Sequence, residues 1–369
     1  MLTDTLGPKD AVDFSTVKRV LVIKLRHHGD VLLTSPVFQV LQNHYPHLEV
    51  DALVYDDTRP MLEHHPAVRQ IHTVGREWKH FGPYAKFKAE LALLRDLKLQ
   101  RYDLVIHLTE SRRGAWLCRM LKPRYAVVRR YENRRDKFWL NSFTHHYKSI
   151  GGNRRHTVEM HLDALRRIGL QASEDERRLV MCLDSEAEQR VNELFKLSKL
   201  KGRYIHIHPT SRWLFKCWSV EKCSQLINRL SASGHQIVLT AAPSSDELKM
   251  IEQITSRLTM PIVNLSGQLR LQDLAVVVAR ARLFIGVDSV PMHIAAAQQT
   301  PCVTMFGPSG EVEWGPWQSP HQLITSDRHP CRPCGQDGCG NSKVSDCLEQ
   351  LGLDRVVNAV QLMLTQAEQ

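Results

Sequence analysis

Residues 22–38, VIKLRHHGDVLLTSPVF, place acid–base side chains directly after an apolar run. Arg26, His27, His28 and Asp30 surround Gly29, a residue that permits turns which a side chain would hinder. Asp30 is expected at the start of the next helix, where aspartate often caps the N-terminus. The same carboxylate, if exposed in a cleft, could act as a general base. This segment alone leaves both interpretations open.

Residues 206–218, HIHPTSRWLFKCW, offer groups that could bind an anion. Thr210 and Ser211 supply hydroxyls, and Lys216 supplies a cation, ahead of a helix expected near Trp218. Hydroxyls and a lysine in a strand-to-helix loop suit a phosphate or diphosphate. The glycines of a Walker A loop are missing. An ordinary polar loop with an exposed lysine is the alternative.

Residues 284–297, FIGVDSVPMHIAAA, end a buried strand at Asp288 and begin a helix of small residues. Backbone N–H groups at such a helix start can bind an anion. Asp288 would repel a phosphate, so we expect it to accept hydrogen bonds from sugar hydroxyls. His293 follows Ser289 by four residues, so it lies on the same helix face. It could belong to this site or could equally be a core histidine.

Four of the nine cysteines gather near the C-terminus in CRPCGQDGCGNSKVSDC. Zinc binds four cysteine thiolates in a tetrahedron, and the four available here are Cys331, Cys334, Cys339 and Cys347. The first two form a CxxC, but the spacing of the other two departs from the second CxxC of a familiar zinc knuckle. The sequence therefore predicts either a structural zinc site or a thiol-rich surface loop.

The elements that must position these residues alternate between short apolar strands and helices. Strands are expected within 17–25, 48–55, 102–108 and 125–129, and again within 204–209, 235–243, 261–267, 282–288, 301–307 and 321–327. Helices are expected over 35–46, 59–66, 87–100, 219–234, 245–258 and 270–281. This alternation is typical of parallel α/β sheets covered on both faces. With 369 residues, it predicts two doubly wound domains, 1–185 and 186–369.

The charge is concentrated in one block of the chain. The net charge is +10, and residues 111–170 hold 15 Lys and Arg against four Asp and Glu, a balance of +11. Such a block indicates an anionic partner, which could be nucleic acid, a bilayer or a phosphorylated substrate. The polar N-terminus and the lack of a long apolar run predict a cytoplasmic protein without a signal or membrane helix.

Together, these segments resemble the lipopolysaccharide-core heptosyltransferases of glycosyltransferase family 9. RHHGD, HPTSRWLFKCW and VDSVPMHIAAA keep the order and strand-end positions of the family motifs, and RHHGD with the cysteine-rich tail is most similar to the heptosyltransferase III type. The resemblance implies a GT-B architecture of two Rossmann-like domains facing a central cleft. It also implies an inverting transfer of L-glycero-D-manno-heptose from ADP-heptose to an inner-core heptose, with no metal required. The C-terminal helix is expected to pack back on the N-terminal domain.

The resemblance also assigns roles to individual residues. Asp30 matches the general base of the family. The donor would be bound by Thr210, Ser211, Lys216, Asp288, Ser289 and His293, with Asp246 or Glu247 at the ribose and Leu269 near the adenine. The acceptor, with its carboxylates and phosphates, would meet Arg26, His28, Arg112, Arg113, Arg134 and Arg135. The gap between the hydroxyl pair and Lys216 is one residue longer than the family pattern.

Two other functions compete with this interpretation. Another GT-B sugar-nucleotide enzyme, such as a different glycosyltransferase or an epimerase, would explain the fold and the donor site. A nucleic-acid-binding protein would explain why Tyr125, Tyr131, Phe138 and Trp139 interleave with the arginines, but not the strand-end motifs, so no nucleic-acid partner is expected. The arginine block, including Arg129 and Arg130, would instead hold the enzyme at the anionic cytoplasmic face of the inner membrane.

Overall fold

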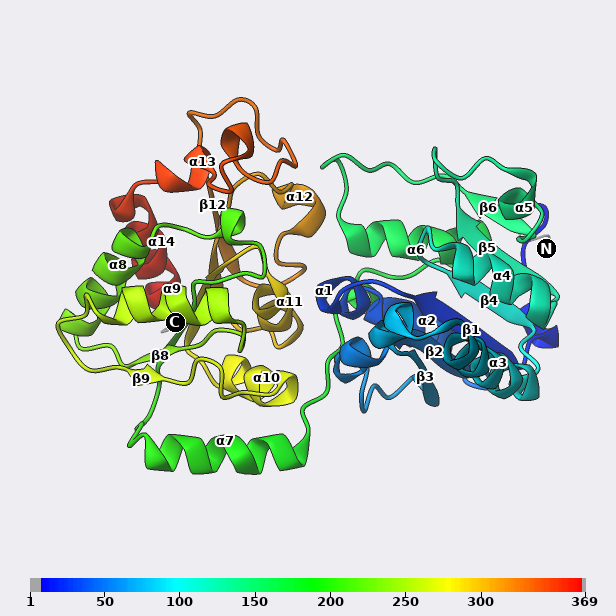
Figure 1. Ribbon diagram of the computed structural model, residues 1–369, viewed down its shortest axis with the longest axis horizontal. Coiled ribbons are helices and arrows are strands. Elements are labelled where there is room, and N and C mark those ends of the chain that lie inside the picture. Colours follow the sequence, from blue (N-terminus) through cyan, green and yellow to red (C-terminus); the bar gives the residue numbers. More distant parts are fainter. Residues whose placement is uncertain (1–7, 367–369) are drawn as a thin grey trace, which may run out of the picture. The chain divides into compact units, whose positions relative to one another are not determined.

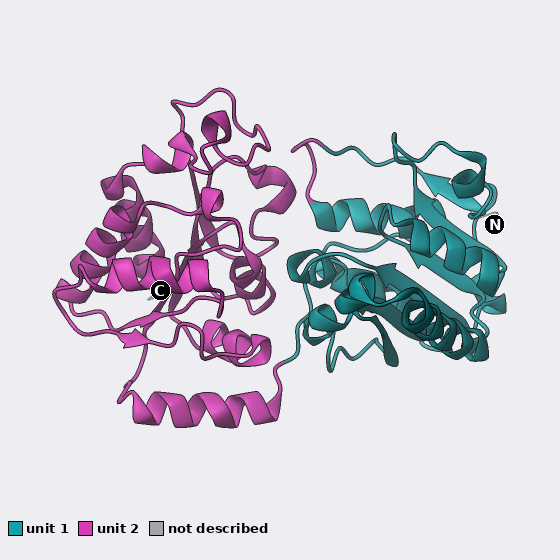
Figure 2. Ribbon diagram, in the orientation of Figure 1, with its two compact units in different colours: residues 1–151, 157–182 teal, residues 152–156, 183–369 magenta. Residues whose placement is uncertain are grey.

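The computed structural model describes residues 8–366, which form two compact units (Figures 1 and 2). The first unit comprises residues 8–151 and 157–182, and the second comprises 152–156 and 183–366. The chain therefore enters the second unit briefly at 152–156 before it returns to the first. The domain boundary at residues 185 and 186 stays a prediction.

The first unit is a six-stranded parallel sheet in the order β3-β2-β1-β4-β5-β6. Its strands are β1 (Arg19–Lys24), β2 (Glu49–Tyr55), β3 (Gln70–Val74), β4 (Leu104–His107), β5 (Tyr125–Arg129) and β6 (His145–Tyr147). Its helices are α1 (His28–Leu32), α2 (Ser35–His44), α3 (Pro83–Gln100), α4 (Arg112–Leu121), α5 (Lys137–Leu140) and α6 (Thr157–Arg167), with 3-10 turns η1 (Phe14–Thr16), η2 (Asp56–Met61), η3 (Arg76–His80) and η4 (Asp175–Arg177). The central strand β1 is buried from Val20 to Lys24, as the apolar run predicts.

The second unit repeats the scheme in the order β12-β11-β10-β7-β8-β9, again parallel. Its strands are β7 (Ile205–His208), β8 (Ile237–Leu239), β9 (Val263–Asn264), β10 (Leu283–Val287), β11 (Cys302–Phe306) and β12 (His321–Thr325). Its helices are α7 (Ser185–Leu197), α8 (Val220–Ala232), α9 (Ser245–Thr255), α10 (Leu271–Ala279), α11 (Val290–Ala297), α12 (Glu311–Trp314), α13 (Asp346–Glu349) and α14 (Leu353–Gln366), with 3-10 turns η5 (Leu214–Lys216) and η6 (Cys339–Asn341). The C-terminal helix α14 packs on β11, β12 and α8 of its own unit.

These sheets confirm the predicted α/β class and its doubly wound, Rossmann-like organisation. Two strands of the first unit, β3 and β6, were not predicted, and both lie at the sheet edges. The helix predicted over 59–66 is wrong. Residues Asp56–Met61 form a 3-10 turn instead, with Pro60 inside it, and His64 takes a left-handed φ of 61° that ends helical geometry.

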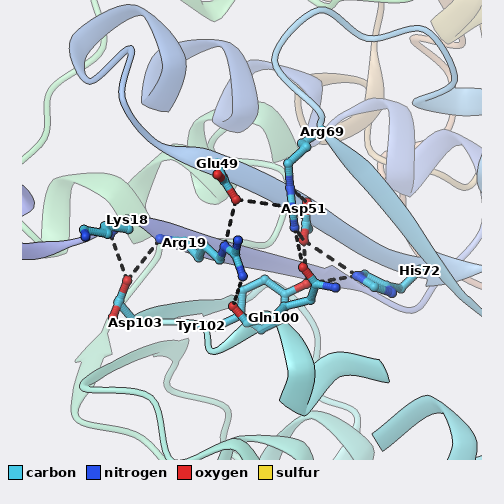
Figure 3. A network of polar contacts seen from close by, with 9 residues as sticks. All are labelled: Lys18, Arg19, Glu49, Asp51, Arg69, His72, Gln100, Tyr102 and Asp103. Carbon is cyan, nitrogen blue, oxygen red and sulfur yellow. Dashed lines mark hydrogen bonds and ion pairs between the residues drawn. The ribbon is translucent and has the colours of Figure 1, made fainter. Parts of the chain in front are cut away.

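The amino ends of the first sheet are joined by a polar network around a buried carboxylate (Figure 3). Arg69 donates to both oxygens of Asp51 at 2.9 and 2.6 Å, and Tyr102 donates to Oδ2 at 2.6 Å. Burial would raise the pKa of Asp51, but hydrogen bonds from His72, Arg69 and Tyr102 hold it below its usual value. The buried charge of Asp51 is thus paired within the protein itself, which indicates a role in stability. The carboxyl ends of the strands, where ligands bind in such folds, lie at the other edge.

Among the described residues, 8–366, no helix is long and apolar enough to cross a membrane.

Candidate active site

Asp30 lies just beyond the carboxyl end of β1, in the first turn of the short helix α1. His27 occupies the N-cap position and makes no side-chain cap bond, so Asp30 is the third helical residue and not the cap. Gly29, expected at a turn, is the second residue of the helix. The Asp30 carboxylate is 17% exposed. Asp30 is therefore not the N-cap of α1, and its role as a base stays a prediction.

A buried lysine holds the Asp30 carboxylate. Lys24 is the last residue of β1 and only 6% exposed, and its Nζ lies 3.5 Å from Asp30 Oδ1. The same ammonium donates to Leu108 O at 3.3 Å and contacts His161 Nε2 at 2.9 Å. Burial lowers the pKa of Lys24, and the charge of Asp30 opposes this shift.

The tautomer of His161 follows from its second contact. Its Nδ1 lies 2.9 Å from the carbonyl oxygen of Leu33, which can only accept, so Nδ1 carries the proton. The lone pair on Nε2 then accepts from Lys24. The lysine thus bridges Asp30 on α1 to His161 on α6 and to the chain leaving β4.

The predicted acceptor residues have different partners in the first unit. Arg26 and Arg134 both approach Glu110, which follows β4: Arg26 Nη2 is 3.9 Å from its carboxylate, and Arg134 Nε donates to its carbonyl at 2.9 Å. Arg112 pairs with Asp136 at 3.0 Å, and Arg113 pairs with Glu90 at 2.5 Å. His28 contacts Asp57 O at 2.9 Å, and Arg135 is exposed. Arg26 and Arg134 are the pair that the fold brings together near the strand ends.

In the second unit, the predicted donor residues Lys216 and Asp288 form an ion pair. Lys216, at the end of η5, places Nζ 2.6 Å from Oδ2 of Asp288, which directly follows β10. Ser289 is the N-cap of α11 and donates to Val287 O at 3.3 Å. The Ser289 side chain makes no cap bond to α11, so the start of this helix lies without that cap next to the Lys216–Asp288 pair. This combination can bind a diphosphate.

The loop after β7 connects to a buried glutamate. Thr210 donates to Glu247 Oε2 at 2.7 Å, and Glu247 also accepts from Ala242 N and from Ser244 Oγ, both at 3.2 Å. Glu247 is buried, whereas its rival Asp246 is exposed on α9. The structure therefore connects Glu247, and not Asp246, to the predicted hydroxyl pair.

For the other predicted donor residues the structure gives burial and packing but no contact that tests donor binding. Ser211 is buried next to Thr210, and His293 is buried on α11. Leu269 is half-buried and packs against the cluster around Leu265. Contacts between these side chains and a nucleotide stay predictions.

A cavity of about 580 Å³ adjoins Lys216 in the second unit. It is lined by Gly152, Asn153, Trp213, Phe215, Lys216, Pro308, Ser309, Gly310, Glu313, Trp314, Pro333, Cys334, Gly335, Gln336 and Asp337. The Gly- and Pro-rich turn after β11 lines this cavity. Trp213, Glu313 and Asn153 were not anticipated. Asn153 Oδ1 accepts from the backbone N–H groups of Val312 and Glu313 at 2.8 and 3.1 Å, which ties the 152–156 segment to α12.

The cysteine-rich tail does not form the zinc site suggested by its spacing. Among the described residues, no three His, Cys, Asp or Glu side chains are placed to hold one metal ion. Cys331, Cys334 and Cys339 are exposed, whereas Cys347 is buried at α13. The fold therefore turns Cys347 into the interior and leaves the other three on the loop, so we assign no metal to them.

Comparisons with known proteins show the family of the chain. The family model for Glycosyltransferase family 9 (heptosyltransferase) matches residues 90–345. Lipopolysaccharide heptosyltransferase 3 of Escherichia coli K12 is 38% identical over 294 residues, 79% of this chain and 83% of that protein. This supports the predicted likeness to the heptosyltransferase III type.

Solved structures with low sequence identity share the fold. The glycosyl transferase family 9 structure from Veillonella parvula superimposes with a TM-score of 0.82 at 20% identity, covering 97% of this chain and 99% of that one. The structure of E. coli ADP-heptose lps heptosyltransferase II gives 0.74 at 18% identity, covering 95% and 100%. The predicted GT-B architecture is thereby confirmed. On the family match and the 38% identity, the chain belongs to glycosyltransferase family 9, the heptosyltransferases, and is a glycosyltransferase.

Proposed function

We propose that this enzyme transfers L-glycero-D-manno-heptose from ADP-heptose to a heptose of the lipopolysaccharide inner core. The 38% identity to a lipopolysaccharide heptosyltransferase 3 is the observation that carries this proposal. The donor is supported by the fold shared with a heptosyltransferase that is named for ADP-heptose. The Lys216–Asp288 pair beside the start of α11 supplies groups suited to both halves of such a donor.

The proposed reaction is a single displacement with inversion. The acceptor hydroxyl oxygen bonds to the anomeric carbon of the heptose while the bond from that carbon to the β-phosphate oxygen breaks. ADP leaves with the electron pair, and Asp30 takes the hydroxyl proton as general base. Lys216 and the N–H groups of α11 stabilise the charge that develops on the diphosphate. No cofactor or metal ion is assigned a role in these steps.

The proposed acceptor site lies on the first unit, which carries Asp30. Arg26 and Arg134, close together at Glu110, are placed to bind acceptor carboxylates or phosphates, and the exposed Arg135 can extend this surface. Arg112 and Arg113 would have to exchange their partners Asp136 and Glu90 for the acceptor. Because the acceptor is lipid-linked, we place the enzyme at the cytoplasmic face of the inner membrane, in peripheral contact with the anionic surface.

An assay of ADP release distinguishes this proposal from another sugar-nucleotide enzyme. ADP-heptose should be consumed only when a core acceptor is present, and mass spectrometry should find the acceptor one heptose heavier. Turnover of the sugar nucleotide without acceptor would overturn the proposal in favour of an epimerase or hydrolase. Salt-sensitive RNA binding without sugar-nucleotide affinity would favour a nucleic-acid-binding protein.

The base assignment has its own test. Asp30→Ala should lower transfer at least about a hundredfold, since general-base catalysis contributes on that order, while leaving ADP-heptose affinity largely intact. Asp175→Asn, at an exposed carboxylate of the same unit, is the control and should be unaffected. Near-normal turnover of the Asp30 variant would refute the assignment.

A further inference from the structure

The outer face of α3 carries an apolar stripe that no part of the described chain covers. Leu93, Leu94 and Leu97 are buried and hold the helix against its sheet. On the outer side, Tyr84 is 80% exposed, Phe87 65% and Leu91 52%. Their spacing of three, four and seven residues places them in one row along the helix. Three adjacent exposed large side chains in one row indicate a contact surface.

The stripe continues into a cavity at the C-terminal half of the helix. This cavity of about 650 Å³ is lined by Arg19, Leu91, Leu94, Arg95, Lys98, Leu99 and Arg101. Leu91 belongs to both features, so they form one continuous surface. We call Tyr84, Phe87, Leu91 and this cavity the α3 surface.

The charge of the α3 surface is positive. Residues 83–101 hold five Lys and Arg against two acidic residues, Glu90 and Asp96. Glu90 is already neutralised by Arg113 at 2.5 Å. Lys86, Lys88, Lys98 and Arg101 are in no ion pair within residues 8–366. A ligand of this surface must therefore combine apolar area with negative charge.

We propose that the α3 surface docks on an anionic phospholipid bilayer, with α3 lying along the membrane plane. Aromatic side chains prefer the boundary between headgroups and acyl chains, and lysines nearby are drawn to anionic headgroups. The cavity, which is lined by leucines together with arginines and a lysine, accepts a headgroup phosphate and its adjoining glycerol. This surface adjoins the arginine block of residues 111–170, since Glu90 of α3 pairs with Arg113. It specifies the membrane contact of the proposed function without resting on the transfer chemistry.

Vesicle co-sedimentation tests the inference on the full-length protein. The wild-type protein should sediment with vesicles of phosphatidylglycerol and phosphatidylcholine, but not with phosphatidylcholine alone, and salt should release it. Tyr84→Ser with Phe87→Ser should weaken partition roughly tenfold. Lys98→Gln with Arg101→Gln should weaken it roughly 25-fold, because each basic residue near an anionic surface contributes about fivefold.

The matched control lies on the second unit, where Leu197 of α7 is 80% exposed beside exposed Lys196 and Lys199. Leu197→Ser with Lys196→Gln should leave vesicle binding unchanged. Loss of binding in this control but not in the α3 variants would overturn the proposal. The proposal would also be overturned if the wild-type protein bound neither type of vesicle or bound both equally. A dimer that becomes monomeric in the α3 variants would assign the surface to a second copy of the chain. ADP release with a delipidated, water-soluble acceptor should be normal in every variant, so failure of docking is distinct from failure of the proposed transfer.

Discussion

Lys24 Nζ lies 3.5 Å from Asp30 Oδ1 at the carboxyl end of β1, and the lysine is the more deeply buried of the two. A buried ammonium needs an anion or several acceptors, and here Asp30, His161 and Leu108 O supply them. The lysine in turn holds the Asp30 carboxylate in place at the carboxyl end of β1. Lys24 is thus a positioning residue for the proposed reaction.

Replacing Lys24 should lower kcat more than it changes the KM for ADP-heptose. In Lys24→Met, Asp30 loses the ammonium that holds it in place, so the proposed base is less well aligned with the acceptor hydroxyl. Lys24→Arg keeps a cation beside Asp30 and should recover part of the rate. The measurement is kcat and the KM for ADP-heptose of both variants and the wild type.

Tyr102→Phe provides the matched control for Lys24→Met. It removes the 2.6 Å hydrogen bond to the buried Asp51 in the network of Figure 3, at the opposite edge of the same sheet. Thermal stability should fall in both variants, but only Lys24→Met should lower kcat. An unchanged kcat in Lys24→Met would leave the lysine with a structural role alone.

The 2.6 Å contact between Lys216 and Asp288 predicts opposite effects of their substitution on ADP binding. Lys216→Met should weaken ADP about ten- to a hundredfold, the range expected for a lost charge-assisted hydrogen bond. Asp288→Asn frees the lysine for the diphosphate, so ADP affinity should hold or rise, while turnover of ADP-heptose should fall at least about tenfold through the lost sugar contact. Calorimetry with ADP and the transfer assay measure the two effects. Lys249→Met, exposed on α9, is the control; equal losses of ADP affinity in the Lys216 and Asp288 variants would contradict this division of roles.

Asp246 and Glu247 are adjacent carboxylates in different environments, and they form a natural pair of variants. Glu247→Gln disrupts the 2.7 Å contact with Thr210 in the loop that leads to Lys216, so ADP affinity should fall about tenfold. Asp246→Asn, exposed on α9, should bind ADP as the wild type does. Calorimetric titration with ADP decides between them. A loss confined to the Asp246 variant would reverse the assignment.

Local patterns predicted most of the fold and the strand-end motifs. All six strands of the second unit were found, because each is a short apolar run ended by Gly, Pro or polar residues. β3 and β6 were missed because QIHTV and HHY are edge strands with polar positions, and they resemble loops in isolation. Asp30, Lys216 and Asp288 were predicted because each lies in the segment that joins the carboxyl end of a strand to the next helix, where chemistry is expected.

The supporting residues could not be read from local patterns. Lys24 falls within an apolar strand, and its partner His161 is 137 positions away in the chain. Asn153 joins the cavity only because it contacts α12 from 159 residues away. Such contacts arise when the sheets close, and no spacing along the chain encodes them. The cysteine spacing, by contrast, suggested a zinc site that the fold does not assemble.

The buried His65 should make the protein sensitive to acid. Its Nδ1 accepts from Ala67 N at 3.1 Å, and its Nε2 donates to Ser35 O at 3.2 Å, so both nitrogens are satisfied by the neutral ring. Burial lowers the pKa of His65 to about 4. In the unfolded chain this histidine binds its proton near pH 6.5. The free energy of unfolding is therefore retained above about pH 6.5, and it falls by up to about 3 kcal/mol as the pH is lowered toward 4. His65→Gln should lower stability near neutral pH through its altered contacts, but lose less Tm than the wild type between about pH 7 and pH 4.5. The control His80→Gln, at an exposed histidine of the same unit, should keep the acid response of the wild type. If His65→Gln lost Tm as steeply as the wild type, His65 would not contribute to the acid sensitivity.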